Sequence, residues 1–178
     1  MNYEYITAIM LSKGSEAPLK AFLKTMDDQL SLSSPLPVII PLAAYPAPFP
    51  PDRVDRGKLR KLESLSFSGL VSKEDGMILT LSDPTLIDRA ADCLKGIHGK
   101  EKPAPLQNPL FSWKGLMLQP EGFPGYRKEI SNLPPLPRMN WHTYRYVQLK
   151  ISWMDNGAWW NHIEWEILWN IRKSRSAK

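Results

Sequence analysis

The chain has 178 residues, 43% of them apolar, and a formal net charge of +5 at pH 7. This length suits one domain spanning residues 1–178, and this apolar content is enough for a buried core. The single cysteine, Cys93, excludes an internal disulfide, and the lack of an apolar run of roughly 18 residues excludes a spanning helix. Because residues 1–11 do not resemble a signal peptide, we expect a cytoplasmic protein that makes no membrane contact.

The excess positive charge lies in the C-terminal third of the chain. Residues 1–126 contain fourteen Lys/Arg and fourteen Asp/Glu, whereas residues 127–178 contain nine and four. Six of the seven tryptophans lie in the latter segment. Cations that pair with phosphates and flat rings that stack on bases are typical of nucleic-acid binding. The alternative is a tryptophan-rich core strand followed by an ordinary basic tail.

The N-terminal part of the chain predicts a strand, a helix and an edge strand. Residues 3–11 are rich in β-forming residues and predict the first strand. Ser15 and Pro18 are typical of a helix start, and apolar residues at helical spacing continue to about Leu30. Residues 38–44 are apolar but lie among prolines, which cannot donate to a ladder, so we expect an edge strand.

The middle of the chain predicts loops, a hairpin and a second helix. We expect a Pro-rich loop over 43–57 and a solvated basic connection over 53–61. Alternating apolar residues on both sides of a turn predict a hairpin over 65–81. Asp83 followed by proline predicts a capped helix, in which Cys93 should be a small buried residue.

The C-terminal part predicts a strand, a long loop and a closing hairpin. A strand over 110–119 should precede a Pro/Gly-rich loop over 120–140, which is a candidate lid or binding loop. Residues 147–153 alternate between apolar and polar, and a turn at 155–157 leads into a second alternating run over 163–171.

The last alternating run predicts a half-buried strand. Every second residue from 163 to 171 is Ile or Trp, so one face of the strand should carry all five side chains. We therefore expect Trp165 and Trp169 to be core residues. Trp159 and Trp160, near the turn, should be freer, and Trp141 and Tyr144 freer still.

Two helices and about seven strands predict an α+β domain. The order of elements suggests two β-α-β-like halves, with helices covering a mostly antiparallel sheet.

In the order and spacing of these elements, most of the chain resembles the two-histidine (2H) phosphoesterases, the superfamily of 2′-5′ RNA ligase-like proteins. The segments that carry the resemblance are "YITAIML", "PLPVIIPLA", "MILTLSDPTLIDRAADCL", "LFSWKGLML" and "YVQLKISW" with "IEWEILWNIR". The resemblance implies the fold of that superfamily. It would also imply two His–apolar–Thr/Ser–apolar motifs, whose histidines act as general base and general acid on a phosphodiester.

The two motif positions of this chain lack that chemistry. They read Ile39-Ile40-Pro41-Leu42 and Gly115-Leu116-Met117-Leu118, without histidine or hydroxyl. No phosphate loop, metal-ligand spacing or nucleophile motif is present either. We therefore name no catalytic residue and expect no metal or cofactor; the missing motifs favour a protein that is not an enzyme but leave that alternative open.

The remaining candidates are ligand-binding residues. Basic, aromatic and histidine side chains that follow the long loop or flank the last hairpin suit base stacking and phosphate contact: Arg138, Trp141, His142, Tyr144, Arg145 and His162. A second basic patch comprises Arg53, Arg56, Lys58, Arg60 and Lys61.

Three functional hypotheses remain open. The first is a non-catalytic domain that binds a nucleotide or single-stranded RNA through its basic, aromatic C-terminal third. The second is a protein-interaction module that uses the Pro-rich segment over 35–51 and the loop over 120–140, since Trp, Tyr and Arg also dominate protein interfaces. The third is a phosphodiesterase-like enzyme whose site the sequence does not reveal.

Overall fold

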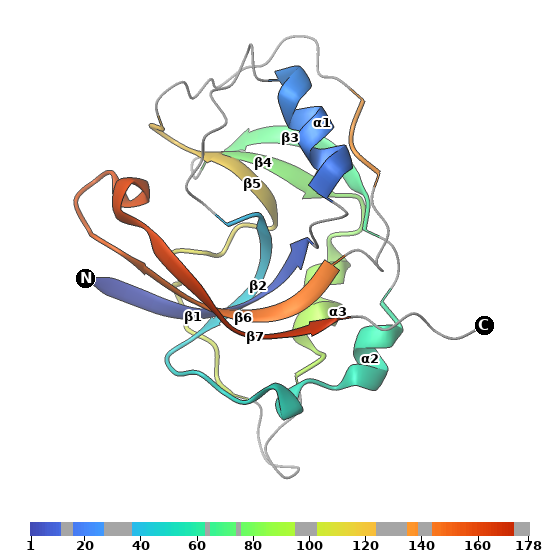
Figure 1. The fold of residues 1–178 in the computed structure, drawn as a ribbon, viewed down its shortest axis with the longest axis vertical. Coiled ribbons are helices and arrows are strands. Elements are labelled where there is room, and N and C mark those ends of the chain that lie inside the picture. Colours follow the sequence, from blue (N-terminus) through green and yellow to red (C-terminus); the bar gives the residue numbers. More distant parts are fainter. Residues whose placement is uncertain are drawn as a thin grey trace.

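The fold is α+β, as the order of elements predicts. The computed structural model describes residues 1–11, 16–26, 37–62, 65–73, 76–94, 103–123, 135–138 and 144–172 (Figure 1). The strands are β1 (Asn2–Leu11), β2 (Ile39–Tyr45), β3 (Phe67–Lys73), β4 (Gly76–Leu81), β5 (Gly115–Pro120), β6 (Tyr144–Trp153) and β7 (Glu164–Arg172). The helices are α1 (Glu16–Met26), α2 (Arg56–Arg60) and α3 (Thr85–Ala91), with 3-10 turns η1 (Pro51–Arg53) and η4 (Trp159–His162). No helix among these residues is long and apolar enough to cross a membrane.

The strands form two antiparallel sheets instead of the single sheet that the sequence suggests. One sheet has the order β2-β1-β6-β7 and the other has the order β3-β4-β5. β1 pairs along its whole length with β6, so the N-terminal strand lies beside the closing hairpin. The expected edge strand is confirmed, because β2 lies at the end of the first sheet with Pro41 next to a register shift.

Local sequence signals explain the helices that cover these sheets. In α1 the apolar stripe buries Leu19, Phe22 and Met26. Asp83 accepts a hydrogen bond from the backbone N–H of Thr85 at the start of α3. Cys93, just beyond α3, is fully buried, as expected.

The basic segment over 53–61, which the sequence predicts as a connection, contains the short helix α2. The side chain of Asp55 accepts hydrogen bonds from the backbone N–H groups of Gly57 and Lys58, at 2.9 and 3.0 Å. These bonds satisfy donors that the first helical turn leaves without partners. Leu59 points into the core and keeps the helix in place.

A β-bulge divides the apolar alternation of β7 between the two faces of its sheet. The register runs Leu149↔Ile167 and then Gln148↔Trp169, so Leu168 has no direct partner on β6. The extra residue turns Trp169 and Ile171 to the face opposite to that of Trp165 and Ile167. The prediction that all five side chains share one face is therefore wrong.

Burial follows this division. Ile171 is buried, and Trp169 is partly buried against the larger core cluster. Trp165 is 43% exposed and Ile167 is 38% exposed, which corrects the prediction that Trp165 is a core residue. Tyr144 and Trp160, predicted to be freer, are both buried.

Gln148 of β6 anchors the segment that precedes η1. Its Oε1 accepts a hydrogen bond from the backbone N–H of Phe49 and another from Nε1 of Trp169, both at 3.1 Å. The same indole N–H also lies 2.7 Å from the backbone oxygen of Phe49. The Trp169 ring stacks on Tyr146 with an interplanar angle of 3°. These contacts hold the residues around Phe49 over the β6–β7 hairpin.

Replacement of Gln148 by methionine should lower the free energy of unfolding by about 1–3 kcal/mol, because the buried Phe49 N–H loses its acceptor while the side-chain volume is nearly kept. Urea denaturation monitored by circular dichroism measures this loss. The matched control is Gln107→Met at an exposed position, which should leave the midpoint unchanged. An unchanged midpoint for Gln148→Met would contradict the anchoring role.

Candidate functional site

The described residues line an open pocket of about 390 Å³, which we call the tryptophan pocket. It lies between β5 with its flanking residues and the β6–β7 connection. Its lining residues are Leu110, Trp113, Met117, Glu121, Gly122, Gly157, Trp159 and Trp160.

Turn geometry places the tryptophans of the β6–β7 connection. The sequence predicts a tight turn at 155–157, but the connection runs from 154 to 163 and contains η4. Gly157 has a φ of +77°, which L side chains rarely adopt. Gly122 has a φ of +74°, and a Cβ there would lie 3.3 Å from the Trp160 ring. Glycine therefore permits the backbone after β5 to approach Trp160 closely.

The aromatic rings behind the pocket pack edge to face. The Phe111 ring centroid lies 5.1 Å from that of Trp113 and 5.6 Å from those of Trp153 and Trp159. The rings of Trp159 and Trp160 are inclined by 78°. Such contacts stabilise each ring and fix its orientation, so the pocket walls are preformed.

A buried carboxyl holds the wall that carries Leu110 and Trp113. Glu4 of β1 is 7% exposed, and its Oε1 accepts a hydrogen bond from the backbone N–H of Leu110 at 2.8 Å. Burial raises the pKa of Glu4, while the N–H groups of Leu110 and Phe111 act in the opposite direction. Glu4 thus positions the segment before β5 at an electrostatic cost when it is ionised.

The lining chemistry of the tryptophan pocket favours a neutral or cationic ligand. Glu121, which is exposed, is the only ionisable side chain among the described residues that line it. Aromatic faces carry negative charge density that attracts cations, and a carboxylate adds to this attraction. An anionic phosphate would meet no cationic partner among these lining residues.

Of the six ligand-binding residues that the sequence predicts, the structure describes four, and it places His162 far from Tyr144 and Arg145. Trp141 and His142 lie outside the described residues, and Tyr144 is 3% exposed within the core, so its ring is not accessible for stacking. Arg145 is the second residue of β6, whereas His162 precedes β7 at the other end of the hairpin. Eight residues of strand separate these ends by about 27 Å.

Arg138 is exposed and forms an isolated bridge with Ser66. Arg145 lies directly opposite Arg172 of β7.

The second basic patch lies on and around α2. Arg56, Lys58, Arg60 and Lys61 are exposed. The Arg53 guanidinium lies 5.8 Å from the centroid of the Phe49 ring. The patch is thus an exposed cationic surface.

The two positions where the resemblance would place catalytic motifs lie in the protein interior. Ile39–Leu42 belong to β2, Gly115–Leu118 belong to β5, and these strands lie against each other. Except for the half-buried Leu42, these residues are buried. Among the described residues, no cluster of His, Cys, Asp and Glu could hold a metal.

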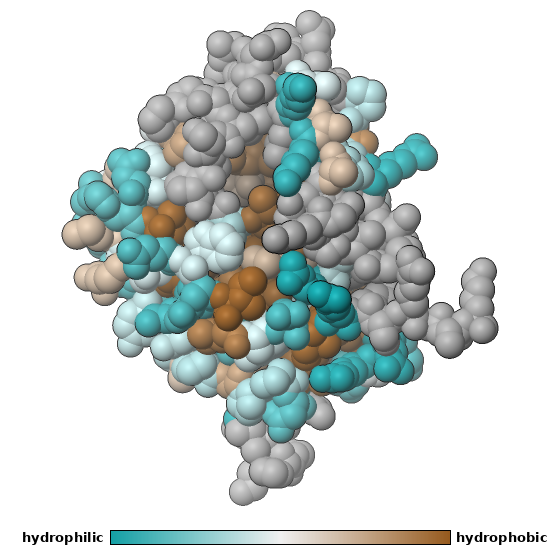
Figure 2. Space-filling model, in the orientation of Figure 1, coloured by the Kyte–Doolittle hydropathy of each residue, from teal (hydrophilic) through white to brown (hydrophobic). Residues whose placement is uncertain are grey.

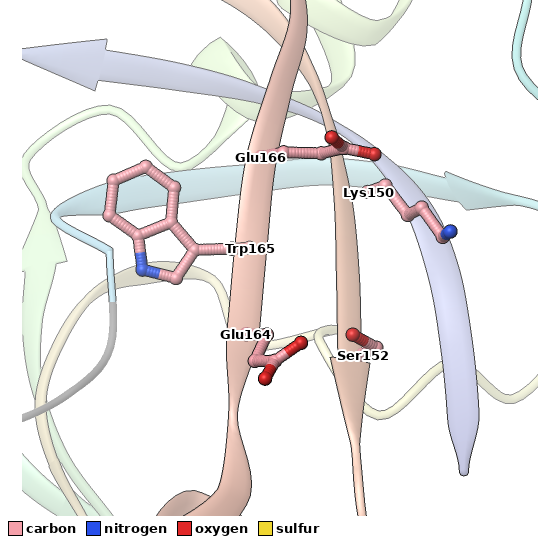
Figure 3. Close-up of a pocket in the computed structure, with 5 residues that line it drawn as sticks. All are labelled: Lys150, Ser152, Glu164, Trp165 and Glu166. Atoms are coloured by element: carbon pink, nitrogen blue, oxygen red, sulfur yellow. The ribbon is translucent and has the colours of Figure 1, made fainter.

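A second, polar cavity of about 230 Å³ lies on the β6–β7 hairpin, and we call it the hairpin groove. It is lined by Lys150, Ser152, Glu164, Trp165 and Glu166. Figure 3 shows the four polar side chains on one side of the two strands and the Trp165 indole on the other.

The chain matches no known protein family, no curated protein and no solved structure. The resemblance to the 2H phosphoesterases therefore stays a prediction.

The pocket residues Trp113, Glu121, Trp159 and Trp160 are absent from the sequence-based candidates. The only signal for them is that Trp159 and Trp160 are adjacent and follow the Asp155–Gly157 turn. The prediction that they are freer than the tryptophans of β7 is wrong for Trp160, which is buried, whereas Trp165 is exposed. Glu121 gives no such signal, since nothing in its local pattern separates it from an ordinary loop carboxylate.

Replacement of Glu4 by glutamine should change how stability depends on pH. With the folded-state pKa raised, the folded protein binds the Glu4 proton more tightly, so the wild type loses stability as pH rises from the unfolded pKa through the folded pKa. The variant lacks this loss and should gain stability relative to the wild type over that interval. Urea denaturation from about pH 4 to about pH 8 measures the difference.

The glutamine amide can also change the free energy of unfolding by an amount that does not depend on pH, and this would shift the whole Glu4→Gln curve. The test therefore rests on how the difference in free energy of unfolding between variant and wild type changes with pH. Glu164→Gln, at an exposed position, is the control and should run parallel to the wild type. A Glu4→Gln curve that also runs parallel would contradict the raised pKa.

Proposed function

We propose that this chain is a ligand-binding domain that takes an organic cation, such as a quaternary or methylated ammonium group, into the tryptophan pocket. The observation that carries the proposal is the inclined pair of Trp159 and Trp160 rings beside Glu121 in one cavity. Inclined aromatic walls contact a rounded cationic group from several sides, and a carboxylate offsets its charge.

The size and rigidity of the pocket support this proposal. Its volume of about 390 Å³ lies in the range of small-ligand pockets, roughly 300–1,000 Å³. The edge-to-face packing around Phe111 and the hydrogen bond from Leu110 to Glu4 hold the walls before a ligand arrives. A preformed site avoids the entropic cost of ordering side chains on binding.

Titration with choline should quench or shift the tryptophan fluorescence in a saturable manner. Its neutral analogue 3,3-dimethyl-1-butanol has nearly the same shape and should bind at least about tenfold more weakly, because it lacks the charge that interacts with the rings and with Glu121. Glu121→Gln and Trp159→Leu should each weaken choline binding while the neutral analogue responds little to Glu121→Gln.

Trp165→Leu is the matched control, since it removes an indole that does not line the pocket. It should leave the choline affinity unchanged. Equal affinity for choline and its neutral analogue would contradict a cation site, and the absence of saturable binding for both would reject the proposal.

Single-stranded RNA or a nucleotide is the second candidate ligand, at the opposite end of the β6–β7 hairpin. Arg145 and Arg172 are direct cross-strand partners, and like charges in such positions repel each other. Nε of Arg145 is buried and has no hydrogen-bond partner among the described residues. A bound phosphate would relieve the repulsion and accept from the guanidinium groups.

The affinity for a short single-stranded RNA should fall steeply as the salt concentration rises. The double variant Arg145→Ala with Arg172→Ala should reduce the slope of log K against log salt by about 0.7 for each lost phosphate contact. Fluorescence anisotropy of a labelled RNA measures both quantities. Lys20→Ala with Lys114→Ala removes two exposed cations elsewhere and should keep most of the affinity. An unchanged slope in the arginine double variant would exclude this site.

A further inference from the structure

β7 is an edge strand whose first half is exposed. It ends the order β2-β1-β6-β7, so one side of its backbone has no strand partner within the described sheet. Trp165, Ile167 and Leu168 are exposed large apolar residues. Figure 2 shows apolar side chains at the surface where β7 runs, with hydrophilic side chains around them. Such an edge is a template for a further strand.

The exposed half of β7 alternates between acidic and apolar side chains. Glu164 and Glu166 lie on the face of the hairpin groove, and Trp165 lies on the opposite face (Figure 3). An added strand would present its own side chains to the same two faces in alternation. Its side chains would therefore meet carboxylates on one face and apolar groups on the other.

The cation that lines the hairpin groove, Lys150, contacts a ring on another strand. Lys150 is opposite Glu166 in the ladder, but its ammonium lies 5.6 Å from the centroid of the Tyr3 ring on β1. Figure 3 shows the Lys150 side chain directed past Glu166 toward β1. The carboxylates thus remain accessible to an incoming cation at the edge.

We propose that Glu164–Ile167 of β7 docks an extended peptide segment of another protein in which basic and apolar residues alternate. The peptide pairs with the free backbone of β7, a lysine or arginine side chain enters the hairpin groove between Glu164 and Glu166, and apolar side chains pack on Trp165 and Ile167. The groove volume of about 230 Å³ accommodates such a basic side chain. This surface shares no lining residue with the tryptophan pocket.

Charge argues against a second copy of this chain as the occupant. Antiparallel pairing of two copies through Glu164–Ile167 would gather two glutamates from each chain in one short ladder, and like charges there repel. The bulge at Leu168 also interrupts regular pairing beyond this segment. A basic peptide meets the opposite situation, since each of its cations faces a carboxylate.

The probe is a capped, fluorescently labelled peptide of about six residues that alternates lysine and valine. Fluorescence anisotropy should show saturable binding, and N-methylation of every backbone amide of the peptide should weaken it at least about tenfold, because the peptide then cannot donate to the ladder in either register. Glu164→Gln combined with Glu166→Gln should weaken it by a similar factor. An alternating glutamate–valine peptide should not bind.

Asp52→Asn with Asp88→Asn is the matched control, since it removes two exposed carboxylates elsewhere and should leave the affinity unchanged. Equal denaturation midpoints for all variants show that the fold is kept. If the N-methylated peptide bound as tightly as the unmodified peptide, the interaction would depend on charge alone and the proposal would be overturned. Full affinity of the Glu164→Gln, Glu166→Gln variant for the peptide would also overturn it. The protein alone could also form a dimer that dissociates when the peptide is added or when Ile167 is replaced by lysine. That result would assign the β7 edge to a second copy of the chain and would overturn the proposal.

Discussion

The bulge at Leu168 is the constraint on which the closing hairpin depends. It turns Trp169 and Ile171 toward the larger core cluster, where the indole N–H meets the Phe49 backbone and Gln148. Without the extra residue, a period of two would place those side chains on the face of Trp165 and Ile167. The same backbone feature therefore fastens the residues around Phe49 over the sheet and leaves the first half of β7 exposed.

The two cavities near the β6–β7 connection have different chemistry. The tryptophan pocket is aromatic and preformed, because ring packing around Phe111 and the buried Glu4 carboxyl fix its walls. The hairpin groove is lined mainly by polar side chains, and it lies beside a strand edge. Both sites present carboxylates to a ligand. The excess positive charge of the C-terminal third is therefore not found at these two sites. The paired Arg145 and Arg172 lie at the other end of the hairpin.

Local patterns predict the elements well and their surroundings poorly. The alternation over 163–171 predicts a strand, and β7 is one, but the pattern cannot reveal a bulge that changes faces halfway. Tyr144 sits beside basic and aromatic residues in the sequence and resembles a binding residue, yet β6 carries its ring into the core. Composition identifies aromatic and basic residues without saying which of them share a surface, because that depends on strand length and direction.

The sequence by itself determined the α+β class, the edge position of β2, the apolar stripe of α1 and the capped start of α3, because each depends on residues within a few positions of one another. Tertiary structure alone decided the division into two sheets, the exposure of Trp165 and the assembly of the tryptophan pocket. These features join Glu4, Leu110 and Trp160, residues from distant parts of the chain, and no local pattern records which distant partners will meet.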